Sequence, residues 1–350
     1  MDLNSFLDEL TQKDGVSGYE ANAADYIAEV FSPFVDETRT DNLGNLIFLK
    51  KGKSEHGPRI LICAHMDEIG FMITKIEEKG FLRFTPLGGF DPRTLPGQEV
   101  RIYGKKIVEG IIGFKPPHLY EESKKNKGVE MDELFIDTGF SREVVDELIR
   151  PGSIAAIKRS FLTLLHNCRA GKTLDDRAGV AVLLQCAKEL ANLTHEANVY
   201  LVATVQEEVG TRGAVVAAYG LSPDLGIAVD VCHGDFPGAP DYEVSTLGKG
   251  PVVTSGPNIH PHMAEGLITA AEEYGLSYQK DVSPGPTGTD ARAMQISRGG
   301  IPTGLLSVPL RYMHTSVELL DLQDVKIAGR LLAYFITRTD SGFVEGLSCL

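Results

Sequence analysis

The stretch RILICAHMD, residues 59–67, contains five consecutive apolar residues between Arg59 and His65. A short, continuous apolar run of this kind is typical of a strand that is buried on both faces, as in a parallel sheet. In open α/β sheets, binding and catalytic groups gather beyond the carboxyl ends of such strands. His65 and Asp67 stand at that end, so the stretch predicts an α/β fold with chemistry at the end of this strand.

The same alternation of apolar strands and amphipathic helices extends through the second half of the chain. We expect strands at 161–166, 199–205, 225–229 and 303–308, and helices at 174–190, 262–274, 290–297 and 322–335. An earlier helix over 21–31 follows Ser17 and Glu20, whose spacing fits a capping box. No internal repeat is found. The pattern predicts a doubly wound α/β catalytic domain.

Between residues 70 and 157 the pattern changes to short, β-rich runs that Gly and Pro interrupt closely. These runs are GFMITKI, FLRFTPL, QEVRIYG, KIVEGIIGF and SIAAI. The segment between the last two, residues 118–133, is highly charged and reads as a mobile loop. We therefore expect a small β barrel or sandwich over 70–157, inserted into a catalytic domain formed by 1–69 and 158–350.

The composition is that of an ordinary globular protein, with 350 residues, 43% hydrophobic and 23% charged. A formal net charge of -14 argues against a nucleic-acid partner, which requires a concentrated basic surface. The acidic N-terminus does not resemble a secretory signal, and no apolar run approaches the ~18 residues of a membrane span. We expect a cytoplasmic protein with no membrane partner. The five scattered cysteines lack CxxC spacing and are expected to be reduced thiols that bind no zinc: Cys63, Cys168, Cys186, Cys232 and Cys349.

Side chains that could bind metal stand at the ends of several expected elements. They are His65, Asp175, Glu207, Glu208, Asp230 and His314. Taken singly, each has an ordinary explanation as a helix cap, a solvated turn or a hydrogen-bonded histidine. Together, two histidines and several carboxylates can fill two adjacent metal sites if one carboxylate bridges them, which leaves one carboxylate to move a proton. The set therefore points to hydrolysis.

The sequence alone leaves two acidic pairs open to more than one interpretation. The pair Asp175-Asp176 suits a helix N-terminus, but one carboxylate can point outward while the other caps. Either member of Glu207-Glu208 could act as a general base while its neighbour holds a metal. Asp67 could contact the second ring nitrogen of a metal-bound His65, as carboxylates commonly do.

The chain also resembles a known family, the M42 metallo-aminopeptidases, which include the glutamyl and TET aminopeptidases. The resemblance spans nearly all of the chain and keeps the order of nine motifs: GVSGYE, AHMDEIGFM, KPPH, FIDTGFS, LDDRAG, QEEVGTRGA, AVDVCHG, GTDA and RYMHTSVE. It implies an aminopeptidase that acts on peptides with a free N-terminus. It also implies a PDZ-like inserted β domain that serves dimerisation, and a homo-oligomer in which dimers assemble into a tetrahedral dodecamer.

The resemblance further implies a role for each residue of the set. His65 and Asp230 should bind one divalent metal, Glu208 and His314 the other, and Asp175 should bridge them. Zn²⁺, Co²⁺ and Mn²⁺ all suit nitrogen and oxygen ligands, with Zn²⁺ or Co²⁺ preferred.

The remaining roles implied by the resemblance concern proton transfer and geometry. Glu207 should be the general base that deprotonates the water between the metals, and Asp67 should orient His65. The peptide bond from Asp175 to Asp176 should be cis. No role is assigned to His118, Asp290 or Arg311, although the stretch Gly288-Thr289-Asp290 suits a turn and helix cap.

Three alternatives remain open at this stage. A glycoside hydrolase of the endoglucanase type would use paired carboxylates without metals, but the chain has no tryptophan to stack on sugars. A different metal-dependent amide hydrolase, such as a deacylase, would use the same site on substrates with a blocked N-terminus. A non-catalytic binding protein could keep the fold without the activity.

Overall fold

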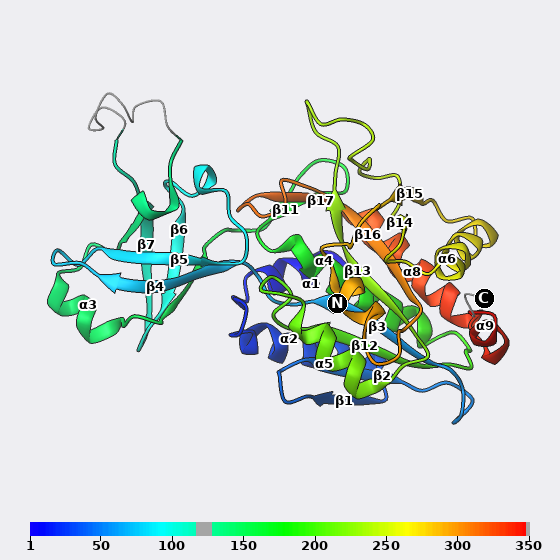
Figure 1. The fold of residues 1–350 in the computed structure, drawn as a ribbon. Helices are drawn as coiled ribbons and strands as arrows, with labels where there is room; N and C mark the ends of the chain where they lie inside the picture. The colour runs from blue at the N-terminus through cyan, green and yellow to red at the C-terminus, as the bar shows by residue number, and fades with distance from the viewer. Residues whose placement is uncertain (117–127, 348–350) are drawn as a thin grey trace.

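The computed structural model describes residues 1–116 and 128–347, and its central feature is an eleven-stranded mixed sheet (Figure 1). Along the main path the strand order is β1-β2-β12-β3-β13-β16-β17-β11-β10, with β14 and β15 joined beside β16. The strands are β1 Glu37–Thr40, β2 Leu46–Lys50, β3 Arg59–His65, β10 Leu162–Thr163, β11 Cys168–Gly171, β12 Asn198–Thr204, β13 Leu225–His233, β14 Val252–Ser255, β15 Gln279–Val282, β16 Thr303–Arg311 and β17 Glu318–Asp321.

The centre of the sheet is parallel, because β12 and β13 both run parallel to β3, and β16 runs parallel to β13. The apolar stretch that opens the sequence forms β3, and its residues from Ile60 to Ala64 are fully buried. Four carboxyl strand ends therefore meet at one edge of the sheet. The predicted α/β sheet is present, and the chemistry predicted for the carboxyl ends of its strands would lie at this edge.

Helices cover both faces of the sheet (Figure 1). A Cβ atom at Gly226 of β13 would meet Met294 of α7, whereas Gly304, which lies beside the next residue of β13, faces Leu267 of α6. Helix α8 contacts α4 and α6, while α5 contacts α7. The helices are α1 Leu3–Thr11, α2 Ala21–Phe31, α4 Leu174–Leu190, α5 Arg212–Leu221, α6 Pro261–Glu273, α7 Asp290–Gln295, α8 Leu322–Thr337 and α9 Ser341–Glu345.

The β-rich insertion forms a closed barrel with its own apolar core, set to one side of the sheet (Figure 1). Its strand order is β4-β5-β8-β7-β6-β9. The strands are β4 Gly70–Ile76, β5 Leu82–Leu87, β6 Glu99–Tyr103, β7 Ile107–Gly113, β8 Phe135–Asp137 and β9 Ile154–Ile157, and α3 Arg142–Leu148 precedes the last. The expected barrel over 70–157 is therefore present, although β8 and α3 were not predicted.

A buried network of charges joins the barrel to the sheet. Asp14 accepts hydrogen bonds from Lys172 Nζ at 2.5 Å, from Arg101 at 3.0 Å and from Tyr103 at 2.6 Å. Lys172 also donates to Glu68 Oε2 at 2.7 Å. A buried ammonium is tolerated only when it is paired. Because Arg101 and Tyr103 belong to β6, the network fixes the barrel against the segment that leads into α4.

Several sequence expectations need correction. Ser17 does not cap α2, whose N-cap is Glu20 and has no side-chain cap bond, because the Ser17 hydroxyl donates to Asp67 instead. The strand expected over 161–166 is reduced to β10, since its apolar run lies in an exposed hairpin in which Leu165 is 85% exposed. Asp230 does not end its strand, because β13 continues to His233.

Other expectations concern the cysteines and the charged loop. The four described cysteines, Cys63, Cys168, Cys186 and Cys232, are free. Residues 118–127 of the expected loop lie outside the described residues, and Met131–Glu133 form a short 3-10 turn. Among the described residues, no helix combines the length and the apolar character that a bilayer span requires.

Candidate metal centre

The carboxyl ends of the parallel strands bring the predicted side chains to one place. His65 ends β3, Glu207 and Glu208 follow β12, and Asp230 lies near the end of β13. His314 follows β16. The sixth predicted side chain, Asp175, lies at the start of α4, which packs against β3 and β13.

Two groups of three potential metal ligands share one carboxylate. His65, Asp175 and Asp230 form the first group, and Asp175, Glu208 and His314 form the second; within each, one ligand atom per residue lies within 4.8 Å of the others. His65 Nε2 lies 3.1 Å from Asp175 Oδ1, and His314 Nε2 lies 3.2 Å from Asp175 Oδ2. Each oxygen of Asp175 thus faces one histidine, so this carboxylate could serve both groups.

The two residues of the Asp175-Asp176 pair do different things. The peptide bond between them is cis, as expected. Asp176 accepts a hydrogen bond from Gly179 N at 2.9 Å and one from His65 N at 3.3 Å, so it stabilises the start of α4 and the end of β3 together. Asp175 is thereby free to point into the centre, which is the division of roles that the sequence left open.

Two further carboxylates support the proposed metal ligands through close contacts and hydrogen bonds. Asp67 lies beside His65, with its backbone oxygen 3.2 Å and its Oδ1 3.5 Å from His65 Nδ1. Glu318, which the sequence reasoning missed, accepts from Asp175 N at 3.1 Å and from His314 N at 3.0 Å. One buried side chain therefore fixes the backbone at both the shared ligand and a histidine of the second group.

Burial and neighbouring groups raise the pKa of several side chains in this centre. Burial raises the pKa of Glu207 to about 9, and the neighbouring charges of Asp230, Asp290 and Glu208 add to the effect. Burial likewise raises the pKa of Asp230 well above its ordinary value. Hydrogen bonds to Asp175 and Glu208 raise the pKa of His314 to about 11. Glu207 and Asp230 therefore hold a proton more tightly than in water chiefly because they are buried, and His314 does so chiefly because of its hydrogen bonds.

This chemistry fits divalent cations. Two neutral imidazoles and three carboxylates, with donor atoms this close, form the set that Zn²⁺, Co²⁺ or Mn²⁺ takes in neighbouring sites. Cations there would replace the protons that otherwise offset the carboxylate charge, and would lower the pKa of each acidic group. Glu207 belongs to neither ligand group, so its carboxylate stays available for proton transfer.

The centre opens onto a cleft of about 340 Å³. His65, Asp175, Glu207, Glu208, Asp230 and His314 all line it. Glu243, Ser245 and Asp281 also line the cleft, together with Cys232 and Thr289. The barrel also reaches the centre, because a Cβ atom at Gly89 would lie 3.1 Å from His314 Nδ1. A side chain at Gly89 would therefore require the histidine or the loop to shift by a few tenths of an ångström.

The structure describes two of the three residues to which the sequence assigns no role. Arg311 lies outside the ligand groups and donates to Asp235, with one nitrogen 2.7 Å from Asp235 Oδ1. Thr289 caps α7, as expected of that turn, and Asp290 accepts a hydrogen bond from Thr204 at 2.6 Å. His118 lies outside the described residues.

The chain is similar to known proteins over most of its length. The sequence profile of the M42 glutamyl aminopeptidases matches residues 44–331. A lysyl aminopeptidase from Pyrococcus furiosus is 40% identical over 333 residues, which cover 93% of this chain and 95% of that protein. The structure of a TET aminopeptidase from a marine sediment archaeon of the Thaumarchaeota superimposes with a TM-score of 0.94 at 34% identity, covering 99% of each chain.

A third relative, also a solved structure, is named for its assembly. It is the TET1 peptidase of Pyrococcus horikoshii, described as assembling into a tetrahedron or a large octahedral shell. It is 36% identical to this chain, with a TM-score of 0.84, and the match covers 96% of this chain and all of that one.

Proposed function

The chain belongs to the M42 glutamyl aminopeptidase family and hydrolyses peptide bonds, and from that premise we propose a two-metal aminopeptidase that removes the first residue of a peptide. The observation that carries this proposal is the shared carboxylate of Asp175, with one oxygen toward each histidine. His65 and Asp230 would complete one metal site, and Glu208 and His314 the other.

The protein groups divide the work of the reaction. Divalent cations bound at these ligands polarise the scissile carbonyl and make an attacking water acidic. Glu207, which lines the cleft beside both ligand groups, would accept the proton of that water and deliver it to the leaving amine. Asp67 would keep His65 in the tautomer that leaves Nε2 free to bind metal. Glu318 would keep Asp175 and His314 at a constant separation.

The proposed organisation of the chain follows the same family. Residues 1–69 and 158–350 would form the catalytic domain, and residues 70–157 a PDZ-like domain that serves dimerisation. A homo-oligomer, with dimers assembled into a tetrahedral dodecamer, is supported by the assemblies named for the Pyrococcus horikoshii relative. The cytoplasmic location and the choice between Zn²⁺, Co²⁺ and Mn²⁺ stay predictions.

One experiment tests the proposed aminopeptidase activity and separates it from the alternative activities. We expect apo protein to be inactive, and added Zn²⁺, Co²⁺ or Mn²⁺ to restore hydrolysis of aminoacyl-arylamides with a free amine. The same amides with an acetylated amine should not be cleaved, because an aminopeptidase recognises the free N-terminus. Cleavage of the acetylated substrates would indicate a deacylase-like hydrolase. Chelator-resistant cleavage of carboxymethylcellulose, without arylamide cleavage, would indicate a glycosidase.

The cleft favours a basic first residue. Its lining also includes the carboxylates of Glu243 and Asp281, and no lysine or arginine is among the described residues that line it. Family and relative names point both ways, since the profile is named for glutamyl and the Pyrococcus furiosus protein for lysyl substrates. Exposed charge pairs are each worth up to about 1 kcal/mol, so two carboxylates that attract Lys or Arg and repel Glu should favour the basic residues by about tenfold.

This preference is measured as kcat/KM for Lys, Arg, Leu and Glu arylamides. We expect the order Lys and Arg, then Leu, then Glu. A variant with Glu243→Gln and Asp281→Asn should lose the preference for Lys over Leu while its turnover of Leu stays close to that of the parent protein. Equal or faster cleavage of the Glu substrate by the unmodified protein would contradict the preference and leave the peptidase activity established.

A further inference from the structure

The turn that carries Glu207 and Glu208 depends on side chains from distant parts of the chain. Four consecutive backbone N–H groups, from Val205 to Glu208, donate outward to side-chain oxygens. Val205 N lies 3.0 Å from Asn45 Oδ1, and Glu207 N lies 2.9 Å from Asp67 Oδ1. We call residues 205–208 the catalytic turn.

Glu20 supplies the acceptor that neither of these side chains provides. Its Oε1 accepts hydrogen bonds from Gln206 N at 3.2 Å and from Gly18 N at 2.6 Å. Glu20 stands 186 residues before Gln206 in the sequence and is only 7% exposed. Its carboxylate therefore joins the N-terminal cap of α2 to the residue directly before Glu207.

Gln206 needs this support because of its backbone conformation. Its φ is +56°, in the left-handed region that residues other than glycine rarely adopt. The carbonyl oxygens of the catalytic turn are already held by the start of α5, since Gly213 N donates to Val205 O at 3.0 Å and Arg212 N to Gln206 O at 3.3 Å. The acceptor on Glu20 holds the opposite side of the same residue.

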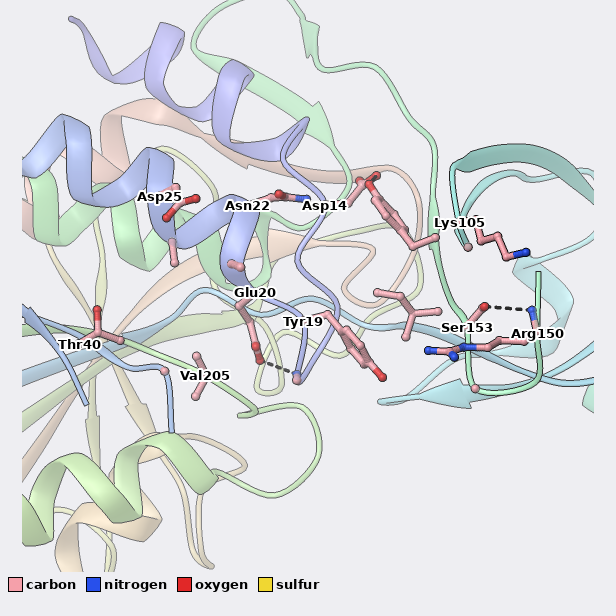
Figure 2. A pocket seen from close by; sticks show the side chains of 18 of the residues that line it. Asp14, Tyr19, Glu20, Asn22, Asp25, Thr40, Lys105, Arg150, Ser153 and Val205 are labelled. Carbon is pink, nitrogen blue, oxygen red and sulfur yellow. Dashed lines mark hydrogen bonds between the residues drawn. The ribbon is translucent and has the colours of Figure 1, made fainter. Parts of the chain in front are cut away.

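Glu20 lies beside a groove, and this allows its effect on the position of the catalytic turn to be separated from an effect on folding. Glu20 and Val205 line a groove of about 1310 Å³ between α2, β1 and the barrel, and Figure 2 shows Glu20 extending from the start of α2 toward Val205. If the Glu20 side chain were truncated, water from the groove could accept from Gln206 N. The hydrogen bond would then be satisfied, but the position of the turn would not be fixed.

On the basis of the proposed aminopeptidase function, we propose that Glu20 is a positioning residue that orients Glu207 through Gln206 N. It contacts neither the substrate cleft nor a proposed metal ligand. Its loss should therefore change the placement of the base while the metals and the apparent substrate affinity stay as they are. General bases are sensitive to such displacement, because an error of about 1 Å can cost about 100-fold in rate.

The test compares Glu20→Ala, Glu20→Gln and the control Asp25→Ala in the metal-loaded, full-length protein. Asp25 lines the same groove from an exposed position on α2. We expect Glu20→Ala to lower kcat by about 100-fold with KM, metal content and Tm unchanged. Glu20→Gln keeps an oxygen that can accept from Gln206 N, so its kcat should recover to within about threefold of the parent value. Asp25→Ala should behave like the parent protein.

A second measurement does not depend on catalysis. Amide hydrogen exchange in the peptide that contains the catalytic turn should be faster in Glu20→Ala than in Asp25→Ala or the parent protein. Unchanged exchange, a parent-like kcat for Glu20→Ala, or a Glu20→Gln variant as slow as Glu20→Ala would each overturn the inference. Loss of metal or of thermal stability in Glu20→Ala would also overturn it. An inactive parent protein would instead refute the proposed function, and the exchange experiment would still decide the role of Glu20.

Discussion

Glu207→Gln is expected to lower kcat by about 1,000-fold while the protein keeps both metals and its fold. The substitution preserves the shape of the side chain, but an amide does not accept a proton at neutral pH. Glu207 is in neither ligand group, so its loss removes no metal ligand. The measurement is kcat and KM on a free-amine arylamide, together with metal content by elemental analysis.

The neighbouring Glu208 provides the matched control. It is also a glutamate of the catalytic turn, but it belongs to the second ligand group and lies 3.4 Å from His314 Nε2. Glu208→Gln should therefore lose metal as well as activity, and excess metal should restore part of the activity. A Glu207→Gln protein with near-normal kcat, or one that loses metal as Glu208→Gln does, would contradict the assignment of the base.

Glu207 must be ionised to act as a base, and bound metals would favour that ionisation. Without cations, burial raises its pKa to about 9, so the group would be protonated at neutral pH and unable to act as a base. Nearby positive charge favours the carboxylate and lowers that pKa. Metal binding at His65, Asp175 and Asp230 would therefore activate the base as well as the substrate.

The sequence predicted the central strands of the sheet, which are buried on both faces, but not the buried strands β2 and β14. The apolar runs at 59–64 and 199–205 became β3 and β12 within one residue at either end. The strand β1 was missed because its residues are all exposed and carry no apolar pattern. The run at 161–166 was misread for the opposite reason, since its leucines lie on an exposed hairpin. Apolar sequence predicts burial well only where the tertiary structure covers it.

The candidate ligands could be proposed from their places at strand and helix ends, but the residues that support them could not. Glu318 and Glu20 act on backbone N–H groups, and their partners Asp175 and Gln206 lie 143 and 186 residues away. Hydrogen bonds to the backbone leave no residue pattern at the partner position. The apparent capping box at Ser17 failed on the same grounds, because its hydroxyl found a buried carboxylate, Asp67, in another segment.

Asp175→Asn is expected to weaken both metal sites, whereas His65→Ala and His314→Ala should each weaken one. Asp175 is the only residue that the two ligand groups share among the described residues, and its two oxygens face different histidines. An asparagine keeps one acceptor oxygen but loses the negative charge that holds two cations at a short separation.

The measurement is metal content per chain after exhaustive dialysis, followed by titration with Zn²⁺ or Co²⁺. His65→Ala and His314→Ala should each retain about one ion, and Asp175→Asn close to none, with both affinities reduced by more than the ~10- to 100-fold typical of outer-shell changes. The variants are matched, because each alters one member of the same ligand set. Retention of one ion at parental affinity by Asp175→Asn would show that the carboxylate serves a single site. The two groups would then be independent, and the chemistry that depends on a shared water would have to be abandoned.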